Sequence, residues 1–137
     1  MEIVTPTKKY HTTHNWVYSC QYHVVWCPKY RRKVLVAPID TRLKELFLEK
    51  QAEYGYQVID MEVMPDHVHL ILDVNPQVGI KSVVSKIKGY TSATIRKEFP
   101  FMKKKLPTLW TRSKFVSTVG AVSLEVVKQY VQEQKGK

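Results

Sequence analysis

The stretch from Met64 to Asp73 alternates polar and apolar side chains in the manner of a half-buried β-strand. Successive side chains of a strand point to opposite faces, so Val68, Leu70 and Leu72 share one face, while His67 and His69 share the other. We expect the apolar face to be buried and the histidine face to be open. Two histidines on an open face could hold one metal ion, although such pairs are at least as often structural.

Hydrophobic periodicity predicts strand, helix, strand, strand, helix, strand and one further helix. The first six elements are the split βαβ arrangement of a ferredoxin-like (RRM-like) α+β fold, in which both crossover helices cover one face of the sheet. That face would receive Val68, which leaves the histidines on the other. The strands are expected at 16–27, 56–64, 67–74 and 109–119, and the helices from Asp40 to Gly55, from 80 to 99 and from 123 to 135.

The 137 residues fit one domain, with 1–15 as a flexible basic lead-in, 16–119 as the ferredoxin-like core and 123–135 as a tail helix. The apolar runs are far shorter than the roughly 20 residues that a membrane span needs. No hydrophobic signal region is present at the N-terminus, so we expect a cytoplasmic protein without a membrane partner.

Positive charge dominates the chain, with 22 Lys and Arg against 12 Asp and Glu, a formal charge of +10. Such an excess indicates polyanionic partners rather than a particular fold. The run 28–33 places four cations around Tyr30, which suits phosphate contacts combined with base stacking. A solvated basic loop is the alternative interpretation.

The predicted tail helix carries Tyr130 and Gln134 on one face, four residues apart. Docked over the open face of the sheet, this helix would present a phenol and an amide oxygen to His67 and His69. Two nitrogen ligands and one oxygen ligand suit Mn²⁺ or Mg²⁺ when substrate phosphates supply further oxygens. Spacing alone supports this only as a hypothesis, because a tyrosine in a terminal helix usually serves packing.

The motifs together resemble the single-tyrosine HUH transposases (TnpA-type) of small insertion sequences that move as single-stranded DNA. The resemblance runs from about Tyr18 to Gln134. Its motifs are Met64-Pro65-Asp66-His67-Val68-His69, Cys27-Pro28-Lys29-Tyr30-Arg31-Arg32-Lys33, Trp110-Thr111-Arg112-Ser113, Phe115-Val116-Ser117-Thr118-Val119-Gly120, and Tyr130 with Gln134.

This resemblance implies that His67, His69 and Gln134 bind Mg²⁺ or Mn²⁺ and that Tyr130 is the nucleophile. It also implies a 5′-phosphotyrosine intermediate, recognition of subterminal DNA hairpins, and a homodimer in which each tail helix serves the partner's histidines. The side chains expected to contact DNA are Lys29, Arg31, Arg32, Lys33, Lys81, Lys88 and Arg112.

Three other functions remain open at this stage. An RRM-like module could bind RNA or single-stranded DNA without chemistry, but it would not account for the histidine pair and Tyr130. A domesticated or replication-type HUH nicking enzyme would share the whole site. A metal-dependent nuclease that activates water would not need Tyr130.

Overall fold

The computed structural model describes residues 11–13, 16–119 and 124–137 of the chain. A four-stranded antiparallel sheet forms its centre, with the strand order β4-β5-β3-β6. The strands are β3 (Gln21–Trp26), β4 (Tyr56–Met64), β5 (His67–Val74) and β6 (Phe115–Thr118). The helices are α1 (Ile39–Glu49), α2 (Gln51–Tyr54), α3 (Ile80–Glu98), α4 (Phe101–Lys105) and α5 (Leu124–Glu133).

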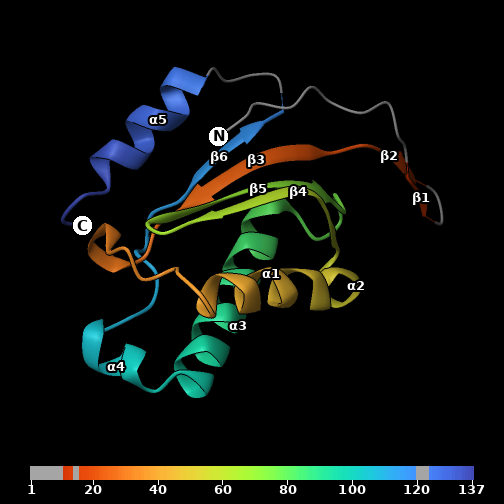
Figure 1. Cartoon of the computed structure of the whole chain (residues 1–137). Helices are drawn as coiled ribbons and strands as arrows, with labels where there is room; N and C mark the ends of the chain where they lie inside the picture. The colour runs from red at the N-terminus through yellow and green to blue at the C-terminus, as the bar shows by residue number, and fades with distance from the viewer. Residues whose placement is uncertain (1–10, 14–15, 120–123) are drawn as a thin grey trace.

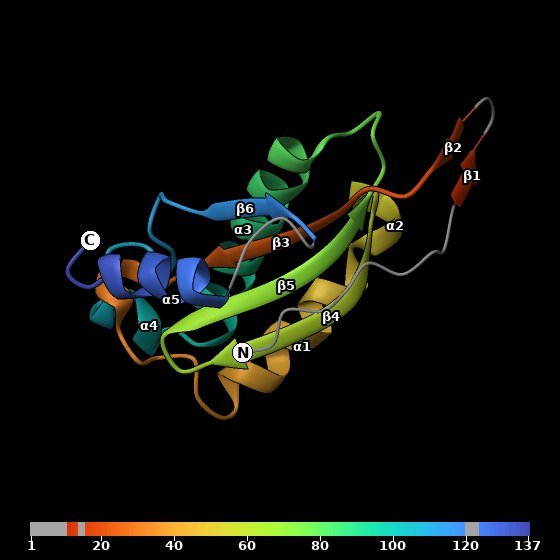
Figure 2. The same cartoon turned by 90° about the horizontal axis from the view of Figure 1, so that it is seen from above.

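This topology confirms the predicted ferredoxin-like α+β fold with an additional C-terminal helix. Helices α1 and α3 lie on one side of the sheet and α5 lies on the other (Figure 1). Seen from above, α5 lies at the end of β3, which it contacts (Figure 2). The open face of the bare ferredoxin-like sheet is therefore covered, in part, by the helix that carries Tyr130.

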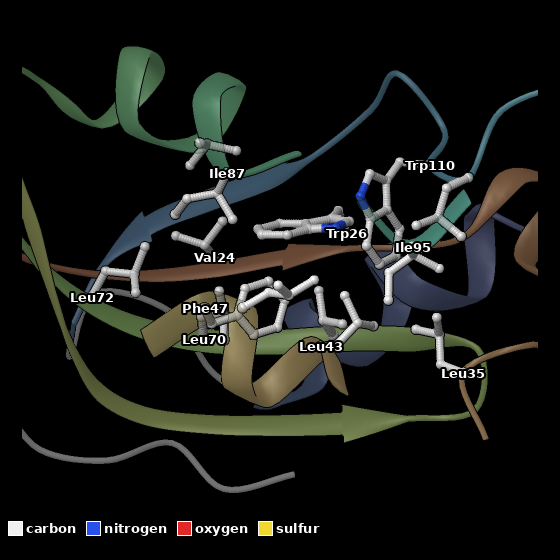
Figure 3. Close-up of a cluster of buried hydrophobic side chains, with 14 of the residues drawn as sticks. Val24, Trp26, Leu35, Leu43, Phe47, Leu70, Leu72, Ile87, Ile95 and Trp110 are labelled. Carbon is white, nitrogen blue, oxygen red and sulfur yellow. The ribbon is translucent and has the colours of Figure 1, made fainter. Parts of the chain in front are cut away.

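The core fills the space between the sheet and the two crossover helices. Every second residue of β5, from Val68 to Val74, and Val24 and Trp26 of β3 belong to it. The Trp26 ring meets Phe47 and Trp110 edge-on, with centroids 6.0 and 5.7 Å apart (Figure 3). Because these apolar side chains all enter one layer, the alternate residues of β3 and β5 must face α5.

Strand β4 contains one more residue than its partner at a β-bulge. Val58 pairs with Leu72 and Asp60 pairs with Ile71, so Ile59 has no opposite residue. Core-facing positions shift accordingly, from Tyr56 and Val58 before the bulge to Met61 and Val63 after it. The carboxylate-bearing Glu62 consequently lies opposite His69.

Two predicted strands are shorter than expected. The strand predicted at 16–27 is interrupted at Ser19 and Cys20, and its first part, β2 (Trp16–Tyr18), pairs with β1 (His11–Thr13) in a separate hairpin that projects from the molecule (Figures 1 and 2). The strand predicted at 109–119 is paired as β6 only from Phe115, apart from one bridge between Trp110 and Pro28.

Smaller corrections concern the ends of helices. The first helix begins at Ile39, one residue before the predicted start at Asp40, and Asp40 accepts a hydrogen bond from the Thr41 amide inside the first turn. Gly55 ends α2 in a left-handed conformation, as expected for a helix C-terminus. The predicted first residue of the tail helix, Ser123, and the remainder of the lead-in, 1–10 and 14–15, lie outside the described residues. In the described helices, no stretch is long and apolar enough to cross a membrane.

Candidate active site on the sheet face beneath the tail helix

His67 and His69 lie on the sheet face that is turned away from α1 and α3, as the alternation along β5 predicts. The neighbouring strand adds His23, which pairs with Ile71 in the register of β3 and β5. His23 and His69 are buried, with 0% and 4% of their surfaces exposed. Three imidazoles therefore share this face rather than two. His23 is not among the residues that the sequence analysis assigned to the site.

Asp66 holds the imidazole of His67 through its Nδ1 atom, 2.8 Å from Oδ1. An ionised carboxylate can only accept, so Nδ1 carries the hydrogen, and in the neutral form of the ring the lone pair is then on Nε2. This Nε2 atom is buried and has no hydrogen-bond partner within the described part of the chain. A carboxylate bound to one nitrogen and an unpaired second nitrogen is the usual arrangement of a metal-binding histidine.

His69 makes a different contact, with the ring of His23. The two rings stack almost parallel, with centroids 5.4 Å apart, and His23 Nδ1 lies 3.2 Å from His69 Nε2. Burial, together with the nearby charges of His23 and His67, lowers the pKa of His69 to about 4. Burial also lowers the pKa of His23. Both rings are therefore neutral near pH 7, as metal coordination requires.

A pocket of about 400 Å³ opens beside His67. The strands β4 and β5 and the turn between them line it with Glu62, Met64, Asp66 and His67, and Arg31 lines it as well. The tail helix contributes Lys128, Val131 and Gln132. A substrate group in this pocket would contact the histidine and α5 at once.

Tyr130 lies on another side of α5, away from the residues that line this pocket. Its hydroxyl shares a hydrogen bond of 2.9 Å with the Ser113 hydroxyl, and its ring packs on Phe115 with centroids 5.4 Å apart. Burial raises the pKa of Tyr130, and the Ser113 hydrogen bond partly offsets this. In this structure the predicted nucleophile is therefore neutral and held against β6. Sequence analysis did not identify Ser113 as its partner.

Gln134, the third predicted metal ligand, is buried, and its Oε1 atom lacks a hydrogen-bond partner among the described residues. Two of the three predicted ligands, His67 and Gln134, thus carry unpaired buried atoms of the kinds that Mg²⁺ and Mn²⁺ accept. Within the same described ranges, no three His, Cys, Asp or Glu side chains form a metal cluster. The residues fit a site that depends on a glutamine and on substrate oxygens.

The predicted DNA-contacting cations occupy different environments. Arg32, Lys33, Lys81 and Arg112 are exposed, whereas Lys29 is partly covered and lies over the Tyr30 ring at 5.2 Å. Arg31 forms an ion pair with Asp66. The ammonium of Lys88 donates to the backbone carbonyls of Thr111 at 2.7 Å, Ser113 at 3.2 Å and Arg112 at 3.5 Å. Burial and the charge of Lys114 lower the pKa of Lys88 to about 8, so its surroundings are those of a structural lysine.

Comparison with known proteins gives the same class of protein as the fold and the site. The family model of IS200-like transposases matches residues 16–134. The chain is 38% identical over 124 residues to the ISDra2 transposase TnpA of Deinococcus radiodurans, covering 89% of both. It is 28% identical to the transposase for insertion sequence element IS200 of Salmonella typhimurium, covering 86% of this chain and 81% of that protein.

Solved structures agree. A candidate transposase from Deinococcus radiodurans superimposes with a TM-score of 0.84 at 32% identity, over 93% of this chain and 99% of its own. A REP-associated tyrosine transposase bound to a REP hairpin gives a TM-score of 0.55 at 12% identity, over 88% and 67%, and shows likeness of fold alone. The chain belongs to the IS200-like transposase family. It is a transposase, and hence a DNA-processing enzyme.

We expect Lys88→Met to destabilise the protein by about 1–3 kcal/mol, because three carbonyls of the 111–113 segment lose a charged donor. Urea unfolding followed by circular dichroism measures this loss. Lys81→Met, an exposed position on the same helix, is the matched control and should change stability by less than about 0.5 kcal/mol. Equal effects of the two substitutions would contradict a structural role for Lys88.

Proposed function

We propose that this transposase cleaves and rejoins single-stranded DNA at the ends of an insertion sequence, through a covalent 5′-phosphotyrosine at Tyr130. The observation that carries the proposal is the pocket beside His67. His67, whose ring is held by Asp66 and whose buried Nε2 atom is unpaired, lines this pocket together with residues of the helix that also bears Tyr130 and Gln134. Membership of the transposase family supports the same function.

The proposed reaction is a transesterification. The Tyr130 oxygen bonds to the scissile phosphorus while the bond from phosphorus to the 3′ oxygen breaks. Tyr130 loses its phenolic proton, and the leaving 3′ oxygen gains a proton. The products are a phosphotyrosine and a free 3′-hydroxyl. Because the number of phosphoester bonds is unchanged, a 3′-hydroxyl can later attack the phosphotyrosine and join strands without a nucleotide cofactor.

His67, His69 and Gln134 would hold a divalent ion, Mg²⁺ or Mn²⁺. Such an ion polarises the scissile phosphate and stabilises the charge that develops in the transition state. That contribution matters because Tyr130 is a weak nucleophile with a pKa raised by burial. The protein's own part is to keep His67 in the Nδ1–H tautomer and to keep His69 neutral.

The reaction also requires Tyr130 to leave Ser113 and Phe115 and reach the histidine face. We propose that the enzyme is a homodimer in which the tail helix of one subunit serves the histidines of the other. The same surface of β3 that receives α5 here would receive the partner's α5 in such a dimer.

The proposed DNA substrate includes subterminal hairpins. The REP-associated transposase of similar fold was seen bound to a REP hairpin. In this chain the exposed cations Arg32 and Lys33 line a pocket of about 320 Å³ together with Lys105 of α4. Three cations around one hollow are suited to backbone phosphates, so we assign this surface to the DNA.

Tyr130→Phe should abolish a covalent protein–DNA adduct that the wild type forms with end-labelled single-stranded DNA from its own element in Mn²⁺. Denaturing gels detect the adduct, and EDTA should remove it from the wild type. Ser113→Ala is a control that keeps the phenol but removes its partner, and it should still form the adduct. Metal-dependent cleavage that persists in Tyr130→Phe without an adduct would contradict the assignment of the nucleophile.

Mixing Tyr130→Phe with His67→Ala protein should restore part of the cleavage activity if sites form between subunits. In each mixed dimer, one of the two sites would combine the intact histidines of the Tyr130→Phe subunit with the intact Tyr130 of the His67→Ala subunit. Each variant alone should be inactive, and this serves as the control. Persistent inactivity of the mixture, in a dimer shown to exchange subunits, would contradict assembly in trans.

Arg32→Gln should weaken binding to single-stranded DNA at all sequences and reduce the slope of log K against log salt by about 0.7. Filter binding or fluorescence anisotropy across a salt series measures both quantities. Lys44→Gln removes an exposed charge from α1, on the far side of the sheet, and should leave the slope unchanged. An unchanged slope in Arg32→Gln would remove Arg32 from the DNA surface.

A further inference from the structure

Arg31 joins two parts of the site that are far apart in the sequence. Its Nε atom lies 3.3 Å from Asp66 Oδ2, and its Nη1 atom donates to the Val131 carbonyl of α5 at 3.2 Å. The other oxygen of Asp66 holds His67. A continuous path therefore runs from the tail helix through one guanidinium and one carboxylate to the Nδ1 atom of the predicted metal ligand.

The backbone at this point adopts an uncommon conformation. Tyr30 and Arg31 have φ angles of +61° and +52°, in the left-handed region that costs a non-glycine residue about 1–2 kcal/mol. Backbone hydrogen bonds hold the turn in place, from the Arg31 amide to Pro28 at 2.8 Å and from the Tyr30 amide to the carbonyl of Lys137 at 2.7 Å. Strained residues that persist in a fold often mark a functional site, and here the strain coincides with the bridging side chain.

The environment of Arg31 differs from that of a DNA-contacting cation. Only 18% of its side chain is exposed, and the partner Asp66 side chain is 20% exposed. Its neighbour Arg32 is exposed and has extended backbone. A planar guanidinium can donate in two directions at once, which a lysine ammonium does with less defined geometry.

We propose that Arg31 is a positioning residue that couples docking of the tail helix to the orientation of His67. When α5 docks, its Val131 carbonyl fixes the guanidinium of Arg31, and the guanidinium fixes the carboxylate of Asp66. Asp66 in turn keeps the hydrogen of His67 on Nδ1, which leaves the lone pair on Nε2. Docking of the helix that bears the nucleophile and preparation of the ligand then become one event. This inference rests on the proposed function, since His67 acts in the reaction as a metal ligand.

Coupling of this kind is reciprocal. If a docked tail helix favours the metal-binding form of His67, then a divalent ion at His67 must favour the docked helix by the same factor. The proposal therefore predicts that Mn²⁺ slows amide hydrogen exchange in residues 127–137 of the DNA-free protein, and that Arg31 is needed for this effect.

The test compares Arg31→Met with Arg32→Met in the absence of DNA. Outer-shell substitutions typically weaken metal binding about 10- to 100-fold, and we expect Arg31→Met to lower Mn²⁺ affinity by about tenfold, measured by titration calorimetry. It should also abolish the Mn²⁺-induced protection of the tail helix and change the ¹⁵N signals by which the His67 tautomer is identified. Arg32→Met should behave as the wild type in all three measurements.

Asp66→Asn provides a second variant that keeps an oxygen for His67 Nδ1 but removes the charge that pairs with Arg31. If the path is real, this change near β5 must speed hydrogen exchange in α5. Arg31→Lys, which keeps the positive charge but not the planar guanidinium that donates in two directions, should retain only part of the coupling. Circular dichroism of each variant establishes that the fold is retained.

The proposal is overturned if Arg31→Met keeps the wild-type Mn²⁺ affinity, the Mn²⁺-induced protection of the tail helix and the wild-type His67 tautomer, and loses only DNA affinity. Arg31 would then be a phosphate contact. A wild type that binds no divalent ion would instead overturn the metal site of the proposed function. In that case the ¹⁵N signals and the exchange of α5 without metal decide on Arg31: changes in both support the coupling, and no change refutes it.

Discussion

Burial of alternate residues on β5 is the constraint on which the rest of this structure depends. Val68, Leu70 and Leu72 enter the core beneath α1 and α3, and hydrogen-bonded strands flank β5 on both sides. A one-residue slip would turn both imidazoles into the apolar core and the apolar set away from it, so the register is fixed by the hydrophobic effect. The positions of His67 and His69 are thus a by-product of packing, and the site needs no separate stabilisation to place them.

The second half of the candidate site lies on a separate element. The tail helix contacts β3, the Tyr130 hydroxyl meets Ser113, and the Val131 carbonyl accepts from Arg31. A sheet that carries the predicted ligands and a separate helix that carries the predicted nucleophile suit the proposed reaction, in which the phosphate must enter between them.

Sequence patterns predicted the elements that periodicity controls. The boundaries of β4 and β5 and the extent of α3 agree with expectation, because alternation and helical spacing are local signals. The early part of 109–119 is not a continuous strand: its first residues bond to the backbone at 27–29, and the carbonyls of 111–113 then accept from Lys88 instead of from a neighbouring strand. The destinations of Arg31 and Lys88 could not be predicted either, because a long cationic side chain is equally compatible with DNA, a carboxylate or a backbone carbonyl until the tertiary contacts are known.

The bulge in β4 makes chain length locally adjustable. Ile59 has no partner across the sheet. On either side of it, the side chains of β4 alternate between the two faces as they would in a regular strand that lacked Ile59. Removing Ile59 would therefore leave Met61 and Val63 in the core and Glu62 opposite His69. Removing any residue from the middle of β5 would invert the faces of one half of that strand. Two adjacent strands of one sheet thus differ sharply in how they tolerate a deletion, and the difference follows from a single unpaired residue.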